Sequence, residues 1–424
     1  MKLHLIAILT ALVLVPARAL SAPVRTDSVA PVSAGVETHV RQYGINPYIP
    51  ALVTGVGAAG LGAVAHYGYP HGFNVIPRRE HGDRGTQFLQ YTPLALPWVM
   101  KAAGVHTRSG WGRMAVSQGL SVAIMAGTVK GLKSGVTSVR PDGSDTHSFP
   151  SGHTAWAFMG ATAASYELAG QSAWYAFGAY TMATGVAVER VLDRHHYPAD
   201  VMAGAGIGIL STGLGYLIGD LIFGQRQLSI SGRHLRDNNN FSFLSVSTGL
   251  NLPVGRIQAG DTRIERLPAL SAGFRGGWAI DDHWGLGLEL GLLSTPLIVN
   301  VHHDRTYAKS LTAVGFMVTP YYSCVLSNRV SITADVGAGY RKNFALSLDE
   351  DAVETGGGTP VGKVDVGCVV RFTHRFSAKA TVGYELSRYD FTVNPSSAYG
   401  IPAHASTKGT SQSLLFSLSS RYEF

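Results

Sequence analysis

The chain has 424 residues, enough for two domains, and a net charge of +7. The positive balance favours anionic partners such as phospholipid and glycolipid phosphates, whereas the lack of a clustered basic motif argues against a nucleic-acid partner. Cys324 and Cys368 are the only cysteines, and no Cys/His metal spacing occurs. Composition therefore argues against a zinc-finger or nucleic-acid-binding protein.

The N-terminal residues have the pattern of an export signal. Lys2 precedes a mostly apolar run over residues 3–15, and a small-x-small cleavage site follows at 17–19. The run is short for a membrane anchor, and a buried N-terminal helix is the alternative. We expect residues 1–19 to be a signal peptide and the mature chain to lie beyond the inner membrane.

Residues 20–225 are rich in Ala and Gly and are predicted to be helical. Four stretches lack charged residues: Pro47–Ala65, Met114–Val129, Ala169–Val188 and Val201–Gly219. Gly, Ala, Ser and Thr dilute their hydropathy, so two interpretations stay open. The stretches are either marginal transmembrane helices or the core of an all-helical soluble domain.

After a linker at 226–240, residues 241–424 change to a period of two. The final strand shows the alternation, with apolar Leu414, Phe416, Leu418, Tyr422 and Phe424 on one face and polar Ser413, Ser417, Ser419, Arg421 and Glu423 on the other. Eight such strands are predicted, near 241–252, 268–280, 283–293, 311–323, 329–341, 361–373, 376–390 and 411–424.

The connections between these strands alternate between tight turns and long linkers, the latter near 253–267, 294–310, 342–360 and 391–410. This alternation is typical of an outer-membrane barrel, and a soluble β-sandwich is the alternative. The terminal Phe424 resembles the C-terminal aromatic signal of inserted barrels, so the barrel-assembly machinery is an expected partner during biogenesis. Cys324 and Cys368 fall on outward faces of non-adjacent strands, so a disulfide between them is not expected.

Three blocks between positions 133 and 200 carry the candidate chemistry. They are Lys133 with Arg140-Pro141, then Pro150-Ser151-Gly152-His153, then Arg190, His196 and Asp200. Together they resemble the three-part signature of the type 2 phosphatidic acid phosphatase family, shared with bacterial acid phosphatases and vanadium haloperoxidases. The family often has Ser before the third-block Arg, where this chain has Glu189. The resemblance implies an all-α phosphatase domain, a helical bundle. The strand alternation predicts that an eight-stranded antiparallel transmembrane β-barrel follows it.

The residue types in these blocks suit a transferring phosphoryl group, whose equatorial oxygens carry negative charge. Lys133, Arg140 and Arg190 would bind those oxygens, and the arginines can do so bidentately. Ser151 and Gly152 stand where a helix should begin, so that the hydroxyl and the amide would point at an anion. No metal or other cofactor is expected.

The resemblance makes His196 the nucleophile that forms a phosphohistidine intermediate. Asp200, four residues on, would share its helix face and hold the imidazole in the required tautomer. His153 would protonate the leaving oxygen. His195 competes with His196, but only His196 has the Arg-x5-His and His-x3-Asp spacings.

An even-stranded barrel places both of its ends on the periplasmic side, so the domain ahead of it should face the periplasm. The connection over 220–240 spans at most roughly 70 Å, too short to cross the periplasm comfortably. We therefore expect an outer-membrane protein of a Gram-negative bacterium whose helical domain rests on the inner leaflet of that membrane.

This placement predicts contact with membrane lipids and a phosphorylated lipid as substrate. Within the resembled family, the enzymes that remove the 1-phosphate of lipid A are periplasm-facing membrane phosphatases, so this reaction is the first expectation. Undecaprenyl pyrophosphate, phosphatidylglycerol phosphate and soluble phosphomonoesters stay open as substrates. Two other hypotheses are a vanadium-dependent haloperoxidase and a non-enzymatic small porin or adhesin with an inactive helical half.

Overall fold

The computed structural model describes residues 48–68, 86–168, 171–224, 242–260, 262–301, 304–327, 330–343, 353–355, 357–371, 376–394 and 404–423. The predicted signal peptide (1–19), the linker (226–240) and Phe424 lie outside these residues.

The N-terminal part is a bundle of helices, as predicted. The helices are α2 (Ile49–Gly68), η1 (Thr86–Tyr91), α3 (Thr92–Ala102), α4 (Trp111–Gly135), α5 (Gly152–Leu168), α6 (Ala173–Leu192) and α7 (Pro198–Ile222). Helix α7 contacts α2, α4 and α5 and is buried along most of its length. Small residues permit this packing, since a Cβ added at Gly208 would stand 2.4 Å from the carbonyl oxygen of Ala155.

The C-terminal part is a closed antiparallel barrel of eight main strands, which confirms the predicted count. They are β1 (Phe243–Val254), β4 (Ala269–Ala279), β5 (Trp284–Val301), β6 (Asp304–Ser327), β7 (Val330–Asn343), β9 (Thr359–Arg371), β10 (Phe376–Val393) and β11 (Ala405–Glu423). The barrel closes because β1 pairs with both β4 and β11.

The two ends of the barrel differ. At the short-turn end, residues 280–283 connect β4 to β5, Ser327 of β6 pairs with Val330 of β7, and Arg371 of β9 pairs with Ser377 of β10. At the opposite, long-strand end, the wall is extended by three short strands, β2 (Ile257–Ala259), β3 (Thr262–Arg266) and β8 (Val353–Thr355). The predicted long linker at 294–310 is wrong, because β5 and β6 continue through it as a hairpin that is paired to Val301 and Asp304.

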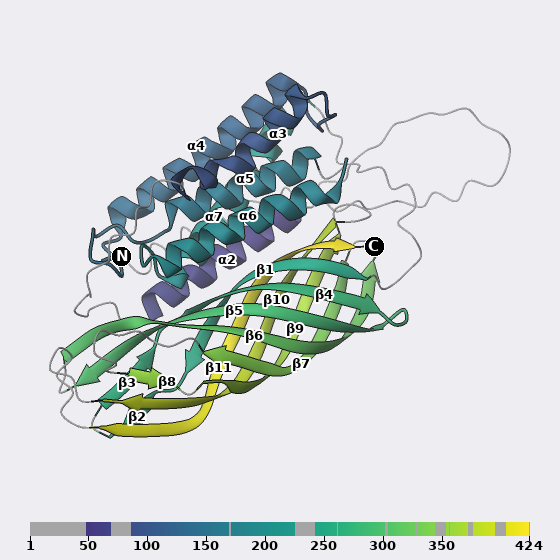
Figure 1. Ribbon diagram of the computed structural model, residues 1–424. Helices are drawn as coiled ribbons and strands as arrows, with labels where there is room; N and C mark the ends of the chain where they lie inside the picture. The colour runs from purple at the N-terminus through teal and green to yellow at the C-terminus, as the bar shows by residue number, and fades with distance from the viewer. Residues whose placement is uncertain are drawn as a thin grey trace.

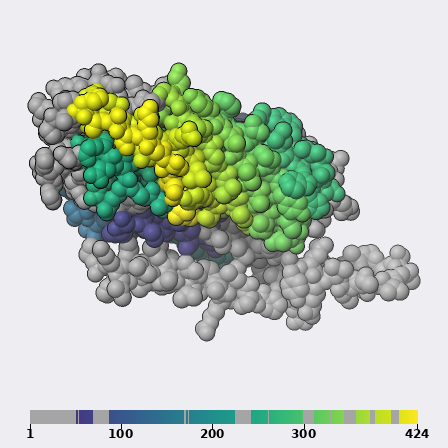
Figure 2. All heavy atoms as spheres, turned by 90° about the horizontal axis from the view of Figure 1, so that it is seen from below, coloured from purple at the N-terminus to yellow at the C-terminus, as the bar shows by residue number. Residues whose placement is uncertain are grey.

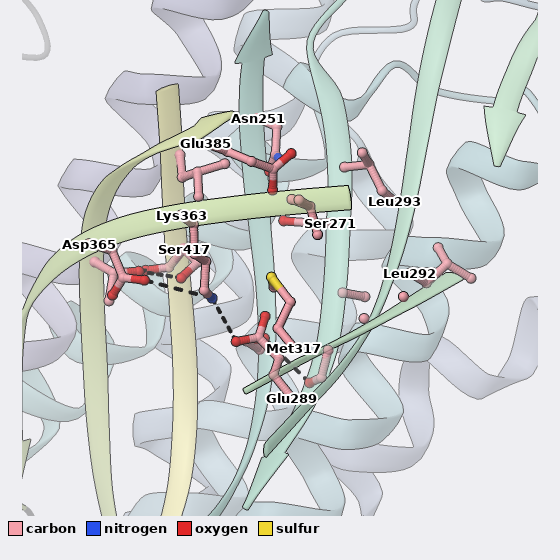
Figure 3. A pocket seen from close by; sticks show the side chains of 18 of the residues that line it. Asn251, Ser271, Glu289, Leu292, Leu293, Met317, Lys363, Asp365, Glu385 and Ser417 are labelled. Carbon is pink, nitrogen blue, oxygen red and sulfur yellow. Dashed lines mark hydrogen bonds and ion pairs between the residues drawn. The ribbon is translucent and has the colours of Figure 1, made fainter. Parts of the chain in front are cut away.

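The barrel interior is filled by charged side chains that pair with one another. Lys363 bonds Glu289 at 2.6 Å, and Arg275 bonds Asp335 at 2.6 Å. Figure 3 shows Glu289 of β5 and Lys363 and Asp365 of β9 around one cavity. That cavity has a volume of about 80 Å³, so the side chains that line it leave room for little more than a few waters.

The barrel exterior is apolar, and the helical bundle covers part of it. Phe274 and Leu290 are 53% and 62% exposed, whereas Leu250 and Leu270 are fully buried against helix side chains. Helices α6 and α7 contact β1 and β4, and Figure 1 shows the bundle lying along the barrel wall. In Figure 2, seen from below, purple α2 borders the barrel strands. Apolar residues of the barrel wall bind helices as readily as lipid, so the bundle packs along the wall; the expected position of the helical domain on the inner leaflet stays a prediction.

Candidate active site

The three sequence blocks meet at one end of the helical bundle. Lys133 lies in the last turn of α4 and Arg190 in the last turn of α6. His153 lies in the first turn of α5, and Asp200 in the first turn of α7. Residues that are up to 67 positions apart in the chain therefore converge because four helices begin or end at the same level.

His196 is held by a backbone carbonyl. Its Nδ1 lies 2.7 Å from the carbonyl oxygen of Ser148, and the side chain is buried. An Nδ1–H that donates to this carbonyl leaves the Nε2 lone pair free to react. Arg194 adopts a left-handed φ of 59°, and the amides of His195 and His196 both donate to the carbonyl of Arg190, at 3.1 and 3.2 Å.

Asp200 contacts His196 less directly than expected. The closest distance between its carboxylate and Nδ1 of His196 is 3.9 Å. Asp200 instead accepts the Ser148 hydroxyl at 2.5 Å and the Tyr197 amide at 3.0 Å. Its other oxygen lies 3.1 Å from Nδ1 of His66. Asp200 thus positions Ser148, whose carbonyl in turn positions His196.

The charge on Asp200 is stabilised by its neighbours. Burial alone raises the pKa of this carboxyl, but the adjacent His196 and His66 outweigh burial and hold the pKa well below its usual range. Asp200 is therefore ionised at neutral pH and can accept hydrogen bonds only.

His153 lies among positive charges. Burial, followed by the charge of Arg190 and the proximity of His196, lowers the pKa of His153 to about 3. His153 is therefore neutral in the free protein at neutral pH. The positive surroundings of His153 disfavour its protonated form as long as no anion is bound. This property suits a general acid that takes up its proton only when a substrate phosphate is present.

The remaining cations line the same region. Nζ of Lys133 donates to the carbonyl of His147 at 2.5 Å, and burial, followed by Arg140, lowers its pKa. Nε of Arg140 lies 3.0 Å from Asp145. Arg190 is buried, with 3% of its surface exposed. Three cations close together repel one another, and this repulsion is relieved by a bound anion.

Ser151 and Gly152 occupy the start of α5, as predicted, but they are arranged differently from the expectation. The Ser151 amide donates to the carbonyl of Asp200 at 3.0 Å, and its hydroxyl lies 3.0 Å from the hydroxyl of Thr154. The backbone at Gly152 is more open, with Val129 as the nearest atom to an added Cβ at 3.8 Å. The Gly152 side of this turn therefore offers space for an anion.

Sequence reasoning missed His66 and Ser148. His66 belongs to α2 and contacts Asp200 across 134 positions, so no local spacing indicates it. Its ring also packs on Phe149, with ring centroids 4.3 Å apart. Among the described residues, no group of three or more His, Cys, Asp or Glu side chains is arranged to hold a metal.

Residues 114–221 match the profile of the PAP2 superfamily, so this segment is a PAP2 superfamily domain. The chain is similar to a lipid A 1-phosphatase of Porphyromonas gingivalis, with 42% identity over 135 residues, which is 32% of this chain and 30% of the relative. The match thus spans about a third of that relative's length.

Among solved structures, the chain is similar to the outer membrane protein OprG from Pseudomonas aeruginosa, with 11% identity and a TM-score of 0.38, covering 44% of this chain and 97% of that one. It is also similar to Neisserial surface protein A, with 10% identity and a TM-score of 0.28, covering 43% and 97% of the two chains.

Proposed function

We propose that this protein is a phosphatase that hydrolyses a lipid-linked phosphate through a phosphohistidine at His196. The observation that carries the proposal is the buried His196, whose Nδ1 lies 2.7 Å from a carbonyl, beside His153 and Arg190. A fixed tautomer, a second histidine and several cations are the groups that phosphoryl transfer requires.

In the first step, Nε2 of His196 attacks phosphorus while the bond from phosphorus to the leaving oxygen breaks. Arg190, Arg140 and Lys133 bind the phosphoryl oxygens and stabilise their charge. The negative charge of the bound phosphate raises the pKa of His153, which then carries a proton and gives it to the leaving oxygen.

In the second step, water attacks the phosphohistidine and the bond between phosphorus and nitrogen breaks. His153, now neutral, accepts a proton from that water. Inorganic phosphate leaves and His196 returns to its neutral form. Throughout, Ser148 holds the proton on Nδ1, so His196 reacts only through Nε2.

The 1-phosphate of lipid A is the proposed substrate. Its support is the similarity to a lipid A 1-phosphatase over 135 residues, together with the PAP2 superfamily match over residues 114–221, which contain most of the candidate site. The barrel adds support, since its apolar exterior and charged interior are those of an outer-membrane barrel. We place the protein in the outer membrane, where a phosphorylated lipid is always close to the site; insertion by the barrel-assembly machinery stays a prediction.

A periplasm-facing phosphatase domain also stays a prediction. A domain on the periplasmic surface would stand at the short-turn end of the barrel. Two contacts relate the bundle to the ends of the barrel. Tyr197, next to His196, packs with Leu267 and Ile298 near the long-strand end, whereas Trp174, at the N-terminal end of α6, stacks on Tyr422 at the short-turn end. The candidate site is therefore nearer to the long-strand end.

The test is phosphate release from purified full-length protein in detergent or lipid. Lipid A with a 1-phosphate, undecaprenyl pyrophosphate and phosphatidylglycerol phosphate are compared under one set of conditions. We expect release from lipid A to be fastest, and no release from any of the three would refute the proposal. Mass spectrometry of lipid A from cells with and without the gene should show the 1-phosphate retained only when the gene is absent.

A further inference from the structure

The described helices carry an uncharged middle section. No Asp, Glu, Lys, Arg or His occurs in residues 49–65, 114–129, 173–188 or 201–219 of α2, α4, α6 and α7. We call this section the waist of the bundle. The exposed side chains on its α4 surface include Ala115, Ala123 and Thr128. Soluble bundles normally place charged residues on such outward faces, so an uncharged outer face needs another explanation.

Charged residues of the bundle gather beyond the two ends of the waist. At the catalytic end are the cations and carboxylates of the candidate site. At the other end, Asp220 binds both Arg113 and, at 2.7 Å, Arg108, and Glu167 accepts the amide of Ser109 at 2.9 Å. An uncharged section between two charged ends is the pattern of a protein that crosses a bilayer.

The height of the waist agrees with that of the barrel's apolar band. The uncharged run of α4, residues 114–129, is about 24 Å long at about 1.5 Å per residue. Outer-membrane barrels carry an outward apolar band about 25 Å tall. The two heights also coincide in space, because Leu250, Leu270 and Leu418 of the barrel wall pack against helix side chains from α2, α5, α6 and α7.

We infer that the helical bundle lies in the same bilayer as the barrel, with lipid around the waist and the catalytic end at the head-group level beside the long-strand end. This inference rests on the outer-membrane location in the proposed function. Helix α7 alone is long and apolar enough to be a candidate membrane span among the described residues, and it is mostly buried. Small residues lower the hydropathy of the other helices, and this low hydropathy is compatible with export of the chain across the inner membrane before assembly.

In this arrangement the candidate site lies beside lipid at the long-strand end of the barrel. Helix α6 runs from the short-turn end of the barrel to the candidate site. Its N-terminal Ala176 packs on Tyr422 at the short-turn end, and its C-terminal Arg190 belongs to the site. The site would meet phosphorylated lipid head groups on the outer face of the bilayer, opposite to the periplasmic orientation predicted from the sequence.

The first experiment measures depth in the membrane by spin labels on full-length protein in lipid, with Cys324 and Cys368 replaced by Ser. Labels at Ala123→Cys on the waist and Leu290→Cys on the barrel wall should be accessible to oxygen and shielded from a polar nickel chelate. Labels at the two ends, Ser144→Cys and Ala103→Cys, should show the reverse. A label at Ala123→Cys that is as accessible to nickel as Ser144→Cys would refute the shared bilayer.

The second experiment fixes the orientation on whole cells with a maleimide too large for porins. Ser144→Cys at the catalytic end and Thr355→Cys in β8 should react, whereas Ala103→Cys and Asp282→Cys should not. Labelling of Thr355→Cys and Ala103→Cys without Ser144→Cys would overturn the outward catalytic end. Both readouts are independent of phosphate release, so an inactive protein would sink the proposed function without deciding the topology.

Discussion

The hydrogen bonds around His196 determine which of its nitrogens reaches the substrate. The Ser148 carbonyl occupies Nδ1 at 2.7 Å, and the Ser148 hydroxyl is bound by Asp200 at 2.5 Å. Asp200 therefore positions His196 mainly through Ser148. A chain of hydrogen bonds of this kind fixes the ring direction as well as the tautomer.

His196→Ala and His153→Ala should each abolish turnover, because one removes the proposed nucleophile and the other the proposed proton donor. Asp200→Asn should be milder, since orientation rather than bond-making is lost. Phosphate release is the measurement, and the heat-modifiable migration of the barrel in gels shows that the variants assemble. Near-normal release from either alanine variant would overturn the assigned roles.

His66 is a positioning residue in this chain of bonds. His66→Ala should lower kcat by about tenfold to a hundredfold with little change in KM, because the displaced carboxylate shifts the nucleophile rather than the bound substrate. His66→Asn, which keeps a donor near the Nδ1 position, should recover part of the rate. His106→Ala, an exposed histidine at the opposite end, is the matched control and should be neutral. Equal losses from His66→Ala and His66→Asn would contradict the positioning role.

The lowered pKa of His153 predicts how stability depends on pH. Unfolded histidine titrates near pH 6.5, whereas the pKa of His153 in the folded protein is about 3. The unfolded state therefore binds more protons below about pH 6.5, and stability is lost as the pH falls from there toward 3. The helical circular-dichroism signal should show a lower unfolding midpoint at pH 5 than at pH 7. This difference should shrink in His153→Ala, and an unchanged difference would contradict the pKa assignment.

The sequence located most of the candidate site because its three blocks are local. Spacing favours His196 over His195 as the proposed nucleophile, and the structure places His196 on the Ser148 carbonyl. His66 was missed because its contact with Asp200 exists only after α2 packs on α7. Tertiary contacts between distant elements leave no periodic mark in a single sequence.

At the scale of the elements, strand alternation predicted the eight main strands well. It missed β2 and β3 in the predicted linker at 253–267, β8 in the linker at 342–360, and the hairpin in the linker at 294–310. All eight strands lie where the period of two placed them. The hairpin through 294–310 was missed because Pro296 precedes a continuous apolar run. Leu297 and Ile298 are both fully buried, so neither face of that segment is polar and no alternation exists to be seen.

The charged network inside the barrel should contribute much of its stability. Lys379 contacts Asp335 and lies 3.6 Å from Asp365, all buried inside the wall. Lys379→Met should lower the free energy of unfolding by about 3–5 kcal/mol, because it leaves buried carboxylates unpaired. Lys408→Met, at an exposed ion pair with Asp390, should cost about 0–1 kcal/mol. Urea unfolding of the reconstituted protein gives both values, and equal effects would argue against the network.

At the scale of the whole molecule, the packing of the helical bundle on the barrel wall could not be predicted from sequence. Outward apolar residues look the same whether they meet lipid or helices, and Leu270 and Phe274 lie four residues apart on one strand with opposite outcomes. The porin hypothesis also loses support at this scale. Ion pairs such as Lys363 with Glu289 cross the lumen, and the cavity that they border is about 80 Å³.

The placement of the site predicts a preference for lipid over soluble substrates. Reconstituted protein should release phosphate faster from lipid A bearing a 1-phosphate than from a short soluble phosphoester. A site held at a membrane surface meets head groups at high effective concentration, and the net charge of +7 adds attraction to anionic lipid. His196→Ala in the same vesicles is the control for contaminating phosphatases. If a deletion strain kept the parental 1-phosphate content of lipid A while undecaprenyl pyrophosphate accumulated, lipid A would be rejected as the substrate and the phosphatase chemistry would stand.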